Sequence, residues 1–281
     1  METNVPIPEI SAASGPPDWA SVTDEIRCPL CEYNLRGLIE PRCPECGYPF
    51  SWSEVLDAAR HHHPYLFEHH GRTPFRSFWR TVWGGRRPRV FWTDLYPAQK
   101  IHPRLLLLYW LITLVPGFVA VFLISLFITQ FRVLVALEQM FDDDFAFVWI
   151  TLSWPWLVFL SLLIFRWSMH RAKVSTGHVL RCIVYSHDAF FWAGLFSSVL
   201  LAGLLIQIAL VPGFNMAAVP NMLPPVMVGS VLGLVLAHLV AIWRLYRAYQ
   251  LYMRFDHVWA TLASAIIIAL LTLANVLVLF A

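Results

Sequence analysis

The sequence predicts an all-α membrane protein with five transmembrane helices, a small N-terminal zinc ribbon and an interfacial amphipathic helix. Hydrophobic residues make up 58% of the 281 residues and charged residues only 14%, against about 45–50% and 25% in soluble domains. Five long apolar runs and two Cys-x-x-Cys pairs are the other two observations. The net charge of +2 gives no overall field that would attract nucleic acid. Five cysteines are too sparse for a secreted disulfide scaffold.

The N-terminal part predicts a short disordered segment followed by a metal-binding ribbon. Residues 1–22 are rich in Pro, Ser and Ala without apolar periodicity, which is typical of disorder. Residues 23–52 carry the two Cys-x-x-Cys pairs, with a hairpin expected around Gly37 and a tight turn at Gly47. A two-residue gap lets both thiolates of a pair face one tetrahedral Zn²⁺. The predicted ligands are Cys28, Cys31, Cys43 and Cys46.

The zinc is expected to be structural. Four thiolates leave no open coordination position for a catalytic water. The alternatives are two disulfides or four free thiols, and a reducing cytoplasm disfavours the disulfides.

Residues 53–103 are expected to form a linker that contains a juxtamembrane helix over 73–83. Thr73 is a plausible N-cap, Pro74 suits the first helical position and Gly84-Gly85 can end the helix. Aromatic and aliphatic residues repeat at helical spacing and form one face: Phe75, Phe78, Trp79, Val82 and Trp83. Arginines lie off that face, which is typical of a helix in the headgroup plane. Nucleic-acid binding is the alternative for such interleaved arginines and aromatics.

Five histidines within residues 61–70 of the same linker leave a second metal site open: His61, His62, His63, His69 and His70. Imidazole binds Zn, Cu or Ni. Pro64 interrupts any helical spacing and no cysteine is near, so a solvated stretch is the favoured interpretation.

Residues 104–281 are expected to form the membrane domain. Each apolar run is 18–24 residues long and lacks Asp, Glu, Lys and Arg, and about 20 such residues cross a bilayer as a helix. The predicted spans are 105–128, 145–165, 189–211, 226–243 and 258–280. With five spans, 19 of the 20 Lys and Arg residues fall on one side. The positive-inside rule then predicts a cytoplasmic N-terminus and an external C-terminus, in the cell membrane if the protein is bacterial.

Few side chains inside the predicted spans could do chemistry. Gln207, His238 and Asn275 are shallow and suited to helix–helix hydrogen bonds. No carboxylate falls inside a predicted span, and no protease or hydrolase motif is present. Cys182 is expected at an apolar position on a short amphipathic helix, with acylation or reactivity as the alternative.

The stretch SFWRTVWGGRRPRVFW over 77–92 and HVLRCIVYS over 178–186 resemble segments of the Yip (Ypt/Rab-interacting protein) family of multi-pass membrane proteins. Asp94-Leu95-Tyr96-Pro97 is similar to that family's D-L-Y-G-P motif but lacks its glycine, and the family's later glycine-tyrosine motif is not evident. The resemblance covers roughly residues 73–281. It implies five spans and a role in membrane organisation or trafficking, with small GTPases as partners in eukaryotes, and no defined reaction.

The sequence therefore predicts a non-enzymatic membrane protein that acts in scaffolding, membrane organisation or trafficking. Its partners are expected to be the lipid bilayer and a cytoplasmic protein that binds the ribbon. One alternative is a small-solute transporter or channel component built around kinks at Pro116 and Pro155. A second alternative is a membrane-embedded enzyme of unknown reaction.

Overall fold

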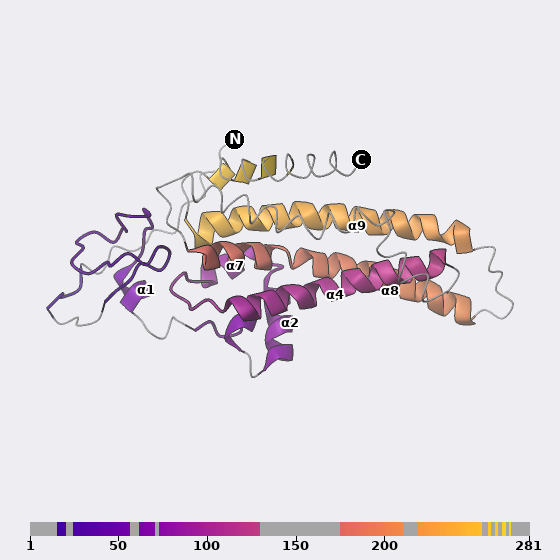
Figure 1. Cartoon of the computed structure of the whole chain (residues 1–281), viewed down its shortest axis with the longest axis horizontal. Helices are drawn as coiled ribbons and strands as arrows, with labels where there is room; N and C mark the ends of the chain where they lie inside the picture. Colours follow the sequence, from indigo (N-terminus) through magenta and orange to yellow (C-terminus); the bar gives the residue numbers. More distant parts are fainter. Residues whose placement is uncertain are drawn as a thin grey trace.

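The long helices of the protein lie side by side, and the cysteine-rich ribbon lies at one end of them (Figure 1). The structure is a computed structural model that describes residues 16–20, 25–56, 62–70, 73–129, 175–210, 219–254 and single positions between 258 and 270. Within these ranges the protein is helical and has no strands, apart from two isolated β-bridges in the ribbon.

The ribbon repeats one small unit twice. Each unit is a knuckle closed by an antiparallel bridge, Arg27 with Asn34 in the first and Arg42 with Pro49 in the second. Its interior is a small apolar core of its own, which comprises Ile26, Cys28, Leu30, Leu35, Cys43, Tyr48, Phe50 and Trp52. The short helix α1 (Trp52–Leu56) follows the second knuckle.

The segment expected to be a linker contributes three short helices to the main core of the protein. These are the 3₁₀ turn η2 (Phe67–His69), α2 (Pro74–Gly84) and α3 (Pro88–Asp94). Pro occupies the first helical position of α2, as expected, although the Thr73 side chain makes no capping hydrogen bond. Only part of the predicted apolar face is buried: Phe78 and Val82 are in the core, whereas Phe75, Trp79 and Trp83 are exposed.

Three helices of the described residues are long and apolar enough to cross a membrane. They are α4 (Pro103–Ile128), α8 (Ala189–Leu210) and α9 (Val219–Arg247), and α8 packs against both of the others. They coincide with three predicted spans: 105–128, 189–211 and 226–243. The predicted span 145–165, and all but single positions of 258–280, lie outside the described residues. The expected five spans are thus matched by three in the described part of the chain.

The α4–α8 contact is a backbone-to-backbone crossing at two glycines. A Cβ atom added to Gly194 would lie 2.4 Å from the Gly117 nitrogen and 2.8 Å from the Pro116 carbonyl carbon. Ser198 also donates a hydrogen bond of 2.8 Å to the Pro116 carbonyl. Small residues allow this close approach in membrane helices. The proline predicted to kink a span therefore lies at a closely packed helix contact.

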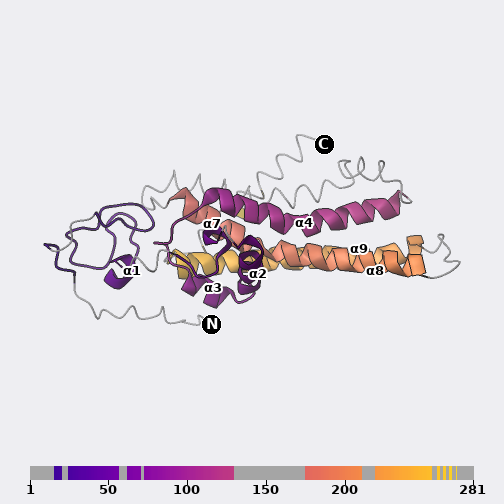
Figure 2. The same cartoon turned by 90° about the horizontal axis from the view of Figure 1, so that it is seen from below.

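Helix α7 (Thr176–Ser186) is the centre of the main core. Every residue from His178 to Ser186 is buried, including the histidine and an arginine. The helix packs against α4, against α9 and against the π-helix η5 (Ala248–Tyr252) that continues α9. Figure 2 shows α7 beside the long helices at the end that faces the ribbon.

Candidate metal centre and the polar network that holds it

The four predicted metal ligands come together at the two knuckles. The sulfur atoms of Cys28, Cys31, Cys43 and Cys46 all lie within 4.8 Å of one another. The Cys28–Cys46 sulfur distance is 3.6 Å and the Cys31–Cys43 distance is 3.5 Å. A tetrahedral ion with Zn–S bonds of about 2.3 Å places its sulfurs about 3.8 Å apart. The donor set therefore fits one tetrahedral metal ion.

The electrostatics of the four thiols favour a bound cation. Hydrogen bonding from Cys46 lowers the pKa of the Cys28 thiol to about 5. The same interaction raises the pKa of Cys46, and burial raises the pKa of Cys31 to about 12. Burial and the neighbouring thiols therefore oppose ionisation of Cys31 and Cys46 in the absence of a metal ion. A divalent metal ion removes this penalty, because ligation deprotonates each thiol.

Each knuckle turns through a residue with a left-handed backbone. Gly47 has φ 73° in the second knuckle, and Glu32 occupies the same place in the first with φ 63°. Their amides donate 2.9 Å hydrogen bonds to the carbonyls of Cys43 and Cys28, respectively. Gly37, where a hairpin turn was predicted, also has a positive φ of 85°. The left-handed conformation is costly for any residue with a Cβ, so glycine is favoured at these turns.

The first knuckle is hydrogen-bonded to the start of α7. The Ser175 amide donates to the Leu30 carbonyl at 2.7 Å. His178 Nε2 lies 2.7 Å from the Pro29 carbonyl, which can only accept, so Nε2 carries the proton. Both carbonyls belong to the Cys28–Cys31 loop, so two of the metal ligands are fixed to the membrane domain through their own backbone.

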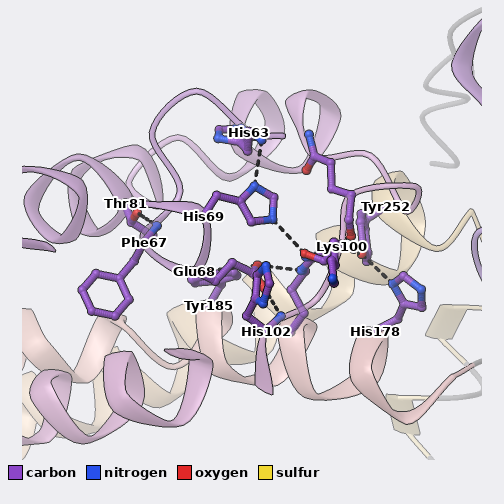
Figure 3. A network of polar contacts seen from close by, with 12 residues as sticks. His63, Phe67, Glu68, His69, Thr81, Lys100, His102, His178, Tyr185 and Tyr252 are labelled. Atoms are coloured by element: carbon purple, nitrogen blue, oxygen red, sulfur yellow. Dashed lines mark hydrogen bonds and ion pairs between the residues drawn. The ribbon is translucent and has the colours of Figure 1, made fainter. Parts of the chain in front are cut away.

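A chain of hydrogen bonds continues from His178 into the core (Figure 3). His178 Nδ1 is the acceptor on that ring, and the Tyr252 hydroxyl donates to it at 2.7 Å. The Tyr252 oxygen in turn accepts from Arg181 Nη1 at 2.8 Å. The guanidinium of Arg181 therefore connects, through one phenol and one imidazole, to the metal-binding knuckle.

Glu68 is the counter-ion at the inner end of this chain. Its Oε1 accepts from Arg181 Nε at 2.8 Å, and both side chains are fully buried. The Tyr185 hydroxyl donates to the same oxygen at 3.2 Å, and the His102 amide donates to Oε2 at 3.2 Å. A buried carboxylate with three donors is well compensated for its lost hydration.

The second knuckle is held by Arg254, which follows the π-helix. Its Nη1 donates to the Pro49 carbonyl at 2.6 Å, and its Nη2 lies 3.5 Å from Glu54 Oε2. The guanidinium carbon lies 5.0 Å from the centre of the Tyr48 ring, whose hydroxyl donates to Glu54 at 3.0 Å. Arg254 itself has a left-handed φ of 54°, a conformation that is uncommon for a residue other than glycine.

A second buried ion pair lies one residue before the predicted span 189–211. Asp188 falls within the apolar stretch Thr176–Gln207 and pairs with Arg244 of α9. The Tyr109 hydroxyl donates to Asp188 at 3.1 Å. A Cβ atom on Gly85 would lie 2.6 Å from Asp188 Oδ2, so the backbone of the turn after α2 packs directly against this ion pair. The sequence missed the pair because Asp188 precedes the uncharged run by one residue.

The histidine-rich segment is a packed loop rather than a solvated stretch. The His63 amide donates to His69 Nδ1 at 2.7 Å, so the other ring nitrogen of His69 donates to the Lys100 carbonyl at 2.8 Å. His70 Nε2 lies 2.9 Å from the His63 carbonyl. These nitrogens are engaged with the backbone, and the described residues hold no metal-type cluster here. His61 lies outside the described residues.

The remaining singled-out side chains have ordinary surroundings where they are described. Cys182 is fully buried on α7, as expected for an apolar position. His238 lies 2.9 Å from the Leu234 carbonyl of its own helix through Nδ1, and Gln207 is exposed. Pro155 and Asn275 lie outside the described residues.

The residues that attach the ribbon carry little signal in the sequence. Arg181 and Arg254 counted there only as positive charges, and Glu68 and His178 were not singled out. Among them only Arg181 stands out locally, as a charged residue between the apolar residues 179–180 and 182–184.

No family model, no curated protein and no solved structure matches this chain. The likeness to the Yip family therefore stays a prediction.

Proposed function

We propose that this chain is a non-enzymatic integral membrane protein that presents a zinc-stabilised ribbon as a rigid docking module for a cytoplasmic protein. The ligand set, four thiolates, suits zinc and leaves no open position for catalysis. The proposed role is scaffolding, membrane organisation or trafficking. The proposal includes five membrane spans and a cytoplasmic N-terminus.

One observation carries the proposal: both knuckles are attached to the membrane domain by hydrogen bonds. Pro29 and Leu30 accept from α7, and Pro49 accepts from Arg254. A module fixed in this way presents its opposite side in a constant orientation relative to the membrane. Preorganisation of this kind lowers the entropic cost of binding a partner.

The ribbon offers an exposed groove for that partner. It has a volume of about 510 Å³ and is lined by residues that include Leu38, Ile39, Arg42 and Pro44. Ile39 is 78% exposed, the highest exposure among the large apolar side chains of the described residues. An apolar anchor at a groove is a common centre of a protein interface.

The closeness of α4 and α8 supports scaffolding over transport. Pro116, where a transporter alternative places a kink, is in close contact with Gly194 and Ser198 of the neighbouring helix. Gln207, the polar side chain of the predicted span 189–211 that was expected to hydrogen-bond to another helix, is exposed on α8.

The test is affinity purification of the full-length chain from solubilised membranes. Wild type is compared with Cys43→Ser, which removes a metal ligand, and with Ile39→Asp, which places a charge in the groove. Val90→Asp is the matched control, because Val90 is an exposed aliphatic residue on α3. We expect one protein to be lost from both ribbon variants and retained by the control. Identical partner sets for all four proteins would remove the proposal.

A further inference from the structure

The outer side of α2 forms a groove that the docking role of the ribbon does not use. It has a volume of about 460 Å³ and is lined by Tyr65, Trp79, Arg80, Trp83 and Gly84. Nearly all of the lining is apolar, and Arg80 is the one charged residue in it. The groove is open to the outside along the exposed side of the helix.

A second arginine is fixed beside this groove. The guanidinium carbon of Arg86 lies 4.5 Å from the centre of the Trp83 ring and 5.1 Å from that of Trp192. Two indole rings hold the cation by cation–π attraction while its N–H groups stay available. Among the described residues neither Arg80 nor Arg86 has a carboxylate partner. Two exposed arginines therefore border an apolar groove, and the described residues supply neither with a carboxylate partner.

The groove lies where the apolar part of the bundle begins. Helix α2 runs across the long axis of the bundle, near its ribbon end (Figures 1 and 2). Its aromatic residues pack on the first turn of α8: Trp79 contacts Phe191, and Trp83 contacts Trp192. In a bilayer this is the level of the headgroups, where Trp and Tyr are enriched. A ligand with an anionic head and an apolar tail would match both features of the groove.

We propose that this groove binds one anionic phospholipid. The phosphate lies between Arg80 and Arg86, and an acyl chain lies along Trp79 and Trp83. Charge complementarity selects the occupant, because an uncharged lipid, an apolar peptide or a second copy of this surface would leave the two arginines unpaired. Arginine suits a phosphate particularly well because its planar N–H groups can bind two oxygens at once.

Native mass spectrometry of the full-length, metal-loaded protein tests this site. The protein is titrated in detergent with dioleoyl phosphatidylglycerol, dioleoyl phosphatidylcholine or inorganic phosphate. The site variant is Arg80→Gln with Arg86→Gln, and the matched control is Arg87→Gln with Arg89→Gln. All four arginines are exposed, and the two variants remove the same net charge.

We expect one phosphatidylglycerol to remain bound to wild type in preference to phosphatidylcholine. The site variant should weaken the affinity for phosphatidylglycerol roughly 30-fold, and the control variant should change this affinity less than about twofold. Equal weakening by both variants would overturn the proposal, since the general positive field would then suffice. Displacement of the lipid by millimolar phosphate, absence of a headgroup preference, or a dimer that occludes Trp83 would each overturn it as well.

Discussion

Removal of the Arg181 guanidinium is expected to destabilise the membrane domain strongly. In Arg181→Met, Glu68 loses its counter-ion while both positions stay fully buried. The lost hydrogen bonds include those to the Tyr252 hydroxyl and to the carbonyls of Gln99 and Lys100. Breaking one partner of a buried ion pair costs about 3–5 kcal/mol. For a chain of this size that corresponds to a decrease in Tm of roughly 6–20 °C.

The assay is thermal unfolding in detergent, followed by intrinsic tryptophan fluorescence, with a double-mutant cycle. Glu68→Met alone should also destabilise, because it leaves Arg181 buried without a carboxylate. The double variant should cost less than the sum of the two single variants by about 2 kcal/mol or more, since it leaves no buried charge unpaired. Arg104→Met, at an exposed arginine of α4, should cost less than about 0.5 kcal/mol. A decrease in Tm below about 2 °C for Arg181→Met, or strict additivity in the cycle, would refute the reasoning.

Three further predictions concern packing, backbone conformation and pH. Gly194→Ala should lower the free energy of unfolding by about 1–3 kcal/mol, because the added Cβ would meet the backbone of Gly117. Gly203→Ala, on the same helix, is the control: its Cβ meets nothing within 4 Å, so this variant should not lower the thermal stability. Gly47→Ala should weaken zinc binding about fivefold or more, because a backbone φ of 73° is strained for any residue with a Cβ. Competition with a chromophoric chelator measures this affinity, and an unchanged affinity would contradict the prediction. Burial lowers the pKa of His63 from 6.5 to about 4, so the folded state keeps the ring neutral where the unfolded state is protonated. The contribution of His63 to stability should therefore be present above pH 6.5 and fall by about 2 kcal/mol between pH 7.5 and pH 5. His63→Gln should reduce the pH dependence of unfolding by that amount; an unchanged pH profile in this variant would count against it.

The parts of the fold that follow from local patterns could be predicted from the sequence. The spacing of the four cysteines and the glycines at 37 and 47 predicted the ribbon and its turns. Uncharged runs predicted α4, α8 and α9, because hydrocarbon imposes a simple length and composition on a spanning helix. Pro74 and the glycines at 84 and 85 predicted the limits of α2.

The attachment of the ribbon to the membrane domain could not be predicted in this way. It depends on pairs far apart in the chain, such as Arg254 with Pro49 and His178 with Pro29. Nothing local distinguishes a buried arginine from an exposed one, so Arg181 served only as evidence for orientation. The expected linker was treated as peripheral because its short elements, such as α3, lack the length that makes periodicity visible.

Hydrogen–deuterium exchange of the full-length protein, with the metal present and after chelation, tests most directly whether the metal-bound ribbon is fixed to the membrane domain. The Ser175 amide is the most informative probe, because its acceptor is the Leu30 carbonyl of the first knuckle. Removal of the metal should speed exchange at Ser175 and in the π-helix Ala248–Tyr252 as well as in the ribbon. Faster exchange confined to the ribbon, with Ser175 and the π-helix unchanged, would contradict a rigid attachment.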